Sequence, residues 1–326
     1  MSRTSLVLAF FLAWGLVASG CVSGSAGPQV ASIGPDVPVT DKPFLDDPND
    51  FQFVVVGDRT GGHRPGVFAH AMQQVNWLQP EFVVCVGDLI EGYTEETDRL
   101  AAEWDELDGM LAKLDMPFFY TVGNHDMGND VMRELWRARL GRDYYHFLYK
   151  DVLFLSLNTE DPPIELPPDI QERQAQLERR MQRDPQGIQR MILERSAAAG
   201  QRPKLPGEVA ISEEQIAYVA KALDENSDVR WTLVLMHKPA WKYESAAFER
   251  IEALLADRPY TVIAGHEHYY SYTKRNGRKY LGTTGGVWLT AGPGAFDHIT
   301  WITMTDEGPV IANIRLDGLL DERRPW

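Results

Sequence analysis

Six polar side chains with the chemistry of metal ligands occur at widely separated places in the chain. They are Asp58, Asp88, Asn124, His237, His266 and His268. A glycine directly precedes four of them, and glycine allows the sharp backbone turn that brings the next side chain inward. Carboxylate oxygens, an amide oxygen and imidazole nitrogens suit divalent cations such as Zn, Mn, Fe or Mg. The set lacks the thiolates of a structural zinc site.

Short apolar segments must position these side chains, and each candidate ligand lies just after the end of such a segment. Predicted strands cover 51–56, 82–86, 118–122, 231–236 and 261–264, a hairpin covers 144–157, and closing strands cover 287–290, 299–305 and 310–314. Helical patterns cover 65–78, 95–114, 212–223 and 244–256. Strands of continuous apolar character that alternate with helices indicate a sheet covered on both faces. Because such sheets bind ligands at the carboxyl ends of their strands, we expect the six side chains to converge on one site.

Five segments, in this order, resemble the signature of the calcineurin-like metallophosphoesterase family. They are Gly57-Asp58-Arg59-Thr60, Gly87-Asp88-Leu89-Ile90-Glu91, Gly123-Asn124-His125-Asp126, His237, and Gly265-His266-Glu267-His268. The resemblance extends from Phe51 to about Ile314. It implies an α/β fold of the four-layer α+β type, with two packed mixed β-sheets flanked by helices and a metal site at the C-terminal ends of the strands.

The resemblance also implies a centre of two divalent metal ions bridged by Asp88. The other ligands would be Asp58 and His268 at one position, and Asn124, His237 and His266 at the other. His125 would be the acid or electrostatic stabiliser of the leaving group, oriented by Glu91 or Asp126. The implied function is a phosphoric monoester or diester hydrolase, in which a hydroxide held by both metals attacks phosphorus in line. The alternative is a non-catalytic metal-containing binding or scaffold protein of the cell envelope.

One position departs from the family pattern, because Thr60 stands where relatives usually have a histidine ligand. Three explanations stay open: that metal has one ligand fewer, Thr60 contributes weakly, or His63 reaches in from the following loop. Thr60 is also the feature that favours the non-catalytic alternative. The presence of His125 and Glu91 argues against that alternative, because metal binding alone needs neither.

The balance of charge limits the partners of the protein. With 47 acidic residues against 32 Lys and Arg, the formal net charge is −15, which is unsuited to general nucleic-acid binding. A phosphorylated substrate remains compatible, since bound metal ions reverse the local field. Arg59 and Arg64 lie in the first ligand loop, where they either grip phosphate oxygens or are ordinary surface arginines. The sequence gives no prediction of oligomeric state.

The N-terminal residues resemble an export signal. Arg3 precedes an apolar run over 6–17 that is too short to span a membrane, so we expect a signal peptide over 1–20. The sequence Ala-Ser-Gly-Cys that ends at Cys21 resembles a bacterial lipobox. It implies a lipid on Cys21 that anchors the protein at the periplasmic or extracellular face of the cell envelope. A plain signal peptide is the alternative, and residues 21–50 would form a flexible tether.

We expect the phosphoesterase-like domain to span 51–316, followed by a C-terminal tail over 317–326. A polar helical insertion interrupts it over about 160–208 and carries seven arginines between Gln171 and Arg202 against four acidic residues. This insertion is either a lid over the site or a solvated excursion. Cys85 lies in an apolar run and is predicted to be a buried thiol.

Overall fold

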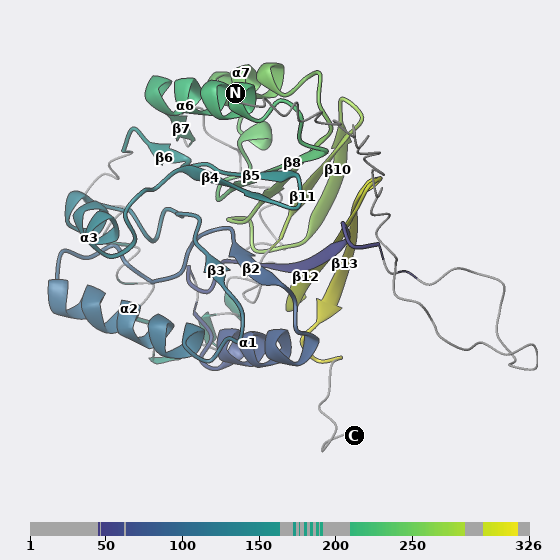
Figure 1. The fold of residues 1–326 in the computed structure, drawn as a ribbon. Helices are drawn as coiled ribbons and strands as arrows, with labels where there is room; N and C mark the ends of the chain where they lie inside the picture. Colours follow the sequence, from purple (N-terminus) through teal and green to yellow (C-terminus); the bar gives the residue numbers. More distant parts are fainter. Residues whose placement is uncertain are drawn as a thin grey trace, which may run out of the picture. The chain divides into compact units, whose positions relative to one another are not determined.

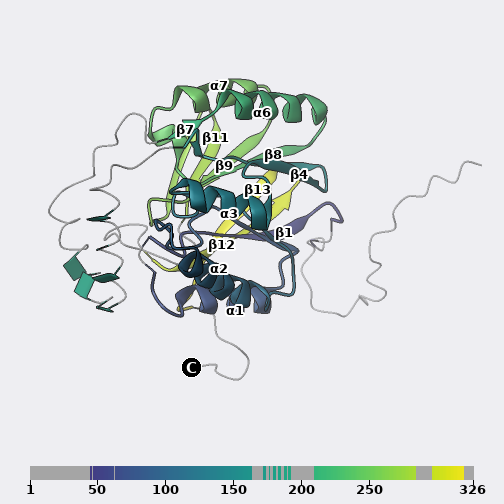
Figure 2. The ribbon, with the colours of Figure 1, turned by 90° about the vertical axis from the view of Figure 1, so that its left-hand side faces the viewer.

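The computed structural model describes residues 45, 47–61, 63–163, 209–283 and 296–318, with scattered positions between 172 and 191. Two β-sheets face each other, and helices cover their outer faces (Figure 1). The view in Figure 2 shows α6 and α7 on one outer side and α1 and α2 on the other. The predicted fold class, two packed mixed β-sheets flanked by helices, is therefore confirmed.

The first sheet has the strand order β13-β12-β1-β2-β3. Its strands are β1 (Phe51–Val56), β2 (Phe82–Cys85), β3 (Phe118–Phe119), β12 (His298–Thr305) and β13 (Gly308–Arg315). Strands β1 to β3 run parallel, and β12 and β13 are antiparallel to their neighbours. The core on its outer face contains residues of α1 (Val67–Leu78), α2 (Thr97–Leu111) and α3 (Asp130–Leu140).

The second sheet has the strand order β10-β11-β9-β8-β5-β4. Its strands are β4 (Tyr145–Tyr149), β5 (Val152–Ser156), β8 (Trp231–Met236), β9 (Tyr260–Ala264), β10 (Ser271–Arg275) and β11 (Arg278–Gly282). Its outer core contains residues of α6 (Glu213–Glu225), α7 (Ala246–Leu254) and the short 3-10 helix η1 (Ala240–Lys242). A separate parallel pair joins β6 (Glu160–Asp161) to β7 (Ala210–Ile211), so the two ends of the predicted insertion lie side by side.

Side chains of the central strands alternate between the two faces of their sheet. In β1, Phe51, Phe53 and Val55 pack between the two sheets, whereas Val54 and Val56 pack against the outer helices. Strand β8 alternates in the same way between the inner core and the core beneath α6 and α7. Burial on both faces explains why these strands are predominantly apolar.

Most predicted elements are confirmed, and their ends shift by a few residues. Strands 51–56 and 231–236 are found with the predicted bounds. The strand predicted over 118–122 keeps hydrogen-bonded strand geometry only at Phe118–Phe119. Cys85 is a buried free thiol, as predicted, and burial raises its pKa to about 12.

Several predictions fall on residues outside the described ranges. These are the signal peptide, the lipid on Cys21, nearly all of the tether and of the C-terminal tail, the strand over 287–290, and most of the arginine-rich insertion. Among the helices of the described residues, none is both long and apolar enough to cross a membrane.

Candidate metal centre

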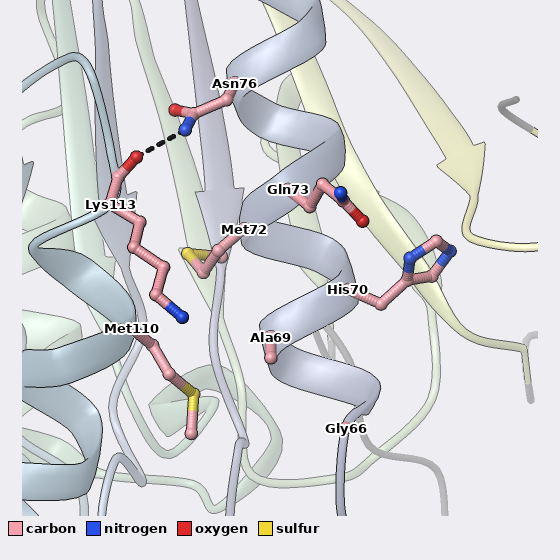
Figure 3. A pocket seen from close by; sticks show the side chains of 8 residues that line it. All are labelled: Gly66, Ala69, His70, Met72, Gln73, Asn76, Met110 and Lys113. Atoms are coloured by element: carbon pink, nitrogen blue, oxygen red, sulfur yellow. Dashed lines mark hydrogen bonds between the residues drawn. The ribbon is translucent and has the colours of Figure 1, made fainter. Parts of the chain in front are cut away.

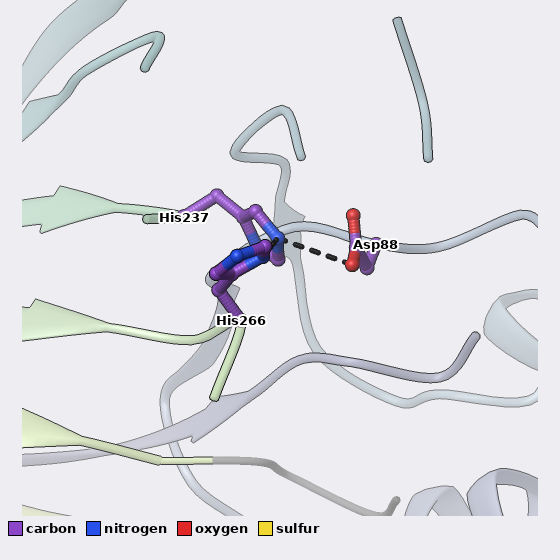
Figure 4. Close-up of side chains that lie close together, drawn as sticks. All are labelled: Asp88, His237 and His266. Carbon is purple, nitrogen blue, oxygen red and sulfur yellow. Dashed lines mark hydrogen bonds and ion pairs between the residues drawn. The ribbon is translucent and has the colours of Figure 1, made fainter. Parts of the chain in front are cut away.

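The loops that follow the central strands bring the six predicted ligands into one cluster. Donor atoms of Asp58, Asp88 and His268 lie within 4.8 Å of one another, and so do those of Asp88, His237 and His266. Figure 4 shows the second group, in which His237 Nε2 lies 3.1 Å from Asp88 Oδ2. Asn124 joins this group, because its Oδ1 is 3.0 Å from the same His237 nitrogen. Asp88 belongs to both groups, which is the position that a bridging ligand requires.

Backbone conformation directs these side chains inward. Four of the six residues have a left-handed backbone, with φ between 47° and 72°: Asp58, Asp88, His266 and His268. This region is costly for residues other than glycine and tends to occur at functional sites. Gly87 allows a close approach of two loops, because a Cβ there would lie 2.8 Å from both the Gly123 backbone and His237 Nδ1.

Asp126 fixes the loop after β2 against the loop after β3. Its Oδ2 accepts hydrogen bonds from the backbone amides of Asp88 and Gly123, at 2.9 and 2.8 Å. Its Oδ1 accepts from the amides of Leu89 and Ile90, at 2.8 and 3.2 Å. Asp126 therefore shapes the backbone around Asp88 and does not orient His125, which corrects one of the two sequence-based alternatives.

The electrostatics of the cluster fit bound cations. Burial lowers the pKa of His268 to about 4 and the pKa of His266 well below its usual value, so both imidazoles are neutral and able to ligate. Burial also raises the pKa of Asp58, whose Oδ2 is buried and has no hydrogen-bond partner within the part of the chain that the structure describes. Burial opposes protonation of His237, yet Asp88 and Asp58 raise its pKa to about 9. Positive charge is thus favoured where the two carboxylates meet.

His125 lies beside the cluster, with its imidazole held by the main chain. Its backbone amide donates to Asp88 Oδ1 at 3.0 Å, and its Nδ1 is 2.8 Å from the Glu91 carbonyl oxygen. A Cβ added at Gly61 would lie 3.2 Å from His125 Nε2 and 3.3 Å from His268 Nε2. Gly61 therefore leaves space between the Nε2 edge of the His125 ring and the candidate ligand His268.

The predicted role of the Glu91 side chain needs correction. Its Oε1 accepts a hydrogen bond from the His63 backbone amide at 2.9 Å, and its Oε2 has no hydrogen-bond partner among the described residues. The Glu91 residue does orient His125, but it does so through its backbone carbonyl, which the side-chain type does not reveal.

One of the three explanations for the missing histidine loses support. The Thr60 hydroxyl donates its proton to the Ile90 carbonyl at 2.6 Å, and the lone pairs of its oxygen remain able to bind a cation, so a weak contribution from Thr60 stays open. Among the described residues, His63 belongs to neither group of candidate ligands. Two explanations thus stay open for the position that contains Asp58 and His268: one ligand fewer, or a weak contribution from Thr60.

The two arginines of the first loop differ in their surroundings. Arg59 is buried, donates to the Leu89 carbonyl at 2.8 Å and pairs with Glu106 at 2.7 Å. This placement contradicts a role in gripping phosphate, because the guanidinium is already used within the fold. Arg64 pairs with Asp297, and its charge helps to lower the pKa of His268, so it remains near the cluster.

Sequence reasoning missed Tyr93, which contacts two residues of the site. Asn124 Nδ2 donates to the Tyr93 hydroxyl at 2.8 Å. The Tyr93 ring meets the His125 ring edge-on, with centroids 4.7 Å apart and an interplanar angle of 80°. The available signal was its position, two residues after Glu91 in the same signature loop.

A separate cavity lies between α1 and α2 (Figure 3). It has a volume of about 540 Å³ and is lined by Gly66, Ala69, His70, Met72, Gln73, Asn76, Met110 and Lys113. None of the candidate ligands lines it, so it is distinct from the cluster at the strand ends.

Comparison with protein families identifies the class to which this fold and site belong. The profile of the family described as calcineurin-like phosphoesterase matches residues 51–270. The chain belongs to this family, as its signature segments predict. Family membership and the two ligand groups support a metal-dependent phosphoester hydrolase with a divalent dinuclear site.

Solved structures share the fold at low sequence identity. A dimetal phosphatase from Danio rerio is 14% identical with a TM-score of 0.52, over 82% of this chain and 99% of that chain. GAP50, the anchor in the inner membrane complex of Plasmodium, is 14% identical with a TM-score of 0.54, over 83% and 86%. The purple acid phosphatase PPD1 from yellow lupin is 12% identical with a TM-score of 0.54, over 83% and 52%. The comparison with curated proteins gives no match.

Proposed function

We propose that this protein hydrolyses phosphoric esters with two divalent metal ions held at the strand ends. The observation that carries the proposal is the pair of buried ligand groups that share Asp88, with His125 beside them. Asp58 and His268 would complete one position, and Asn124, His237 and His266 the other. A binding protein without activity needs the ligand groups but has no need of His125.

Bound divalent cations would supply a hydroxide nucleophile near neutral pH and neutralise charge on the phosphate oxygens. The chain itself supplies the proton for the departing oxygen. His125 Nδ1 donates to the Glu91 carbonyl, so we assign the opposite ring nitrogen, Nε2, to the substrate; in the protonated ring it donates to the leaving group. Gly61 keeps room for the substrate in front of this atom.

The proposed substrates are phosphorylated compounds as a class, and they include both monoesters and diesters. Arg64 is the remaining candidate for a phosphate contact, since Arg59 is held within the fold. An arginine close to a metal-bound phosphate would grip its oxygens through two N–H groups.

A reconstitution assay tests the function directly. The purified protein is stripped with a chelator, reloaded with Mn²⁺, Zn²⁺ or Mg²⁺, and assayed with p-nitrophenyl phosphate and bis(p-nitrophenyl) phosphate. We expect metal-dependent release of nitrophenol from at least one of the two esters. Metal uptake without turnover of either ester would instead support the non-catalytic alternative.

We also propose that the protein is exported and anchored to the cell envelope by a lipid on Cys21. The support is the apolar run over 6–17 and the lipobox-like sequence that ends at Cys21. Mass spectrometry of the mature protein should find an N-terminal Cys21 that carries acyl chains, and Cys21→Ala should remove them. An unmodified terminus at another residue would contradict the proposal.

A further inference from the structure

The amide of Asn124 has two chemically different ends. Its Oδ1 is an acceptor able to bind a cation, whereas Nδ2 is a donor and repels one. Only a rotation about the terminal torsion distinguishes the two orientations. Oδ1 lies 3.0 Å from His237 Nε2, inside the cluster, and Nδ2 points to the Tyr93 hydroxyl at 2.8 Å. In this orientation the Tyr93 hydroxyl accepts from Nδ2 while Oδ1 faces the cluster, so the hydrogen bond stabilises the orientation suited to metal binding.

The backbone around Tyr93 is held in place by several contacts. Tyr93 has a left-handed φ of 46°, a conformation that costs free energy unless the surroundings impose it. The preceding Gly92 has a φ of 59°, and its amide donates to Glu103 Oε2 at 2.9 Å. A Cβ at Gly128 would lie 2.7 Å from the Tyr93 ring, so glycine there lets the ring pack closely. Tyr93 is thus a rigid support.

The same ring braces His125. The edge-on contact at 4.7 Å supports one side of the imidazole, and the Glu91 carbonyl holds its Nδ1. One side chain therefore touches both a candidate metal ligand and the proposed proton donor.

We propose that Tyr93 is a positioning residue, whose hydroxyl keeps the oxygen of Asn124 turned toward the metal site. The proposal rests on the proposed function, because it assumes that Asn124 binds a metal ion. Groups that orient a metal ligand typically change metal affinity by about 10- to 100-fold when they are removed. The hydroxyl of Tyr93 should therefore control metal affinity without contacting the metal.

The test is calorimetric titration of the metal-free protein with Mn²⁺. Tyr93→Phe removes the hydroxyl and keeps the ring against His125. We expect it to weaken the tighter of the two Mn²⁺ positions by about 10-fold or more, because Asn124 belongs to the position with more protein donors. Unchanged Mn²⁺ affinity in this variant would overturn the proposal.

Tyr145→Phe is the matched control. It removes another partly exposed tyrosine hydroxyl, which donates to the Tyr120 carbonyl at 2.7 Å and touches no candidate ligand. We expect wild-type Mn²⁺ affinity for this variant. A comparable loss of affinity would mean that any lost tyrosine hydroxyl weakens the site, which contradicts a specific role for Tyr93.

A second comparison separates orientation from general damage to the fold. In Asn124→Asp both ends of the side chain are oxygens, so no wrong orientation exists. In that background, adding Tyr93→Phe should change Mn²⁺ affinity by less than about 3-fold, whereas it costs about 10-fold or more beside Asn124. Equal losses in the two backgrounds would show that Tyr93 acts through folding and not through the amide.

Binding and turnover distinguish this proposal from the function on which it rests. A wild-type protein that binds Mn²⁺ but hydrolyses no ester contradicts the proposed function, and the Tyr93 comparison still decides the role of the hydroxyl. A wild-type protein that binds no Mn²⁺ overturns both.

Discussion

Each carboxylate oxygen of Asp88 contacts a different neighbour. Oδ2 lies 3.1 Å from His237 Nε2, and Oδ1 accepts the backbone amide of His125 at 3.0 Å. His237 and His125 lower the pKa of Asp88 despite its burial, so the carboxylate is charged in the cluster. At the scale of single residues, Asp88 contacts both a candidate metal ligand and the proposed proton donor, whose roles can be tested separately.

The pair Asp88→Asn and His125→Ala tests that separation. We expect Asp88→Asn to lose bound metal, because it removes the ligand that both groups share. His125→Ala should keep its metal and lower kcat by about 10²- to 10⁴-fold, the usual contribution of a general acid. Metal analysis together with steady-state kinetics checks both, and an equal loss of metal in the two variants would show that the roles are assigned wrongly.

Thr60 provides a prediction about the weaker metal position. A neutral hydroxyl is a weak ligand, so we expect Thr60→Val to leave the affinity of both Mn²⁺ positions unchanged. Thr60→His should tighten the position with Asp58 and His268, since it restores a donor there. Calorimetric titration measures both. A weaker site in Thr60→Val would instead identify the hydroxyl as a ligand.

At the scale of elements, Asp126 connects the segments that carry the site. Its carboxylate accepts hydrogen bonds from four backbone amides in the loops after β2 and β3. Strand β3 itself is only two residues long, so the ladder alone contributes little to the position of Asn124. The loops are therefore held by a side chain where strand pairing ends.

Asp126→Asn should destabilise the fold. An amide offers one accepting oxygen in place of two, so two of the four buried N–H groups lose their partner, at about 1–3 kcal/mol each. Urea unfolding should show a loss of about 2 kcal/mol or more in the free energy of unfolding. Asp105→Asn, on the exposed face of α2, is the control and should change it by less than about 0.5 kcal/mol. Equal stability of the two variants would contradict the role of Asp126.

At the scale of the whole molecule, burial of the apolar core stabilises the fold, whereas burial of carboxylates at the strand ends destabilises it. The core between the sheets contains a cluster of aromatic rings. The ring centroid of Phe82 lies 5.3 Å from that of Phe53 and 5.5 Å from that of Phe154. At the strand ends, by contrast, the carboxylates of Asp58 and Asp88 are buried, and Asp58 Oδ2 has no hydrogen-bond partner among the described residues. Bound cations should therefore contribute to global stability.

Metal binding should raise the free energy of unfolding through mass action. With free Mn²⁺ at about 100 times the dissociation constant, one occupied position adds about 2.7 kcal/mol. Thermal unfolding with Mn²⁺ and with a chelator measures the shift in Tm, and Asp88→Asn should abolish most of it. A Tm that does not respond to Mn²⁺ would contradict the assignment of this cluster as a metal site.

Local sequence patterns were sufficient to predict the main strands and helices and the convergence of the six candidate ligands. Apolar alternation and glycine-containing turns act between near neighbours in the chain, so they are legible without a structure. Helix α3 was missed because charged residues interrupt its apolar face. The β10–β11 hairpin was missed because β10 is a largely exposed edge strand.

The sequence by itself determined which polar residue types follow the end of each strand, and hence the class of site. Only the tertiary structure decided what each polar atom touches. Arg59 is buried beside Leu89, the hydroxyl of Thr60 is bound to Ile90, and the amide of Asn124 is oriented by Tyr93. These contacts join positions about thirty residues apart, between loops that meet because their strands are neighbours in one sheet. Residue type limits what a group can bind, but the partner is fixed by which loops the fold brings together.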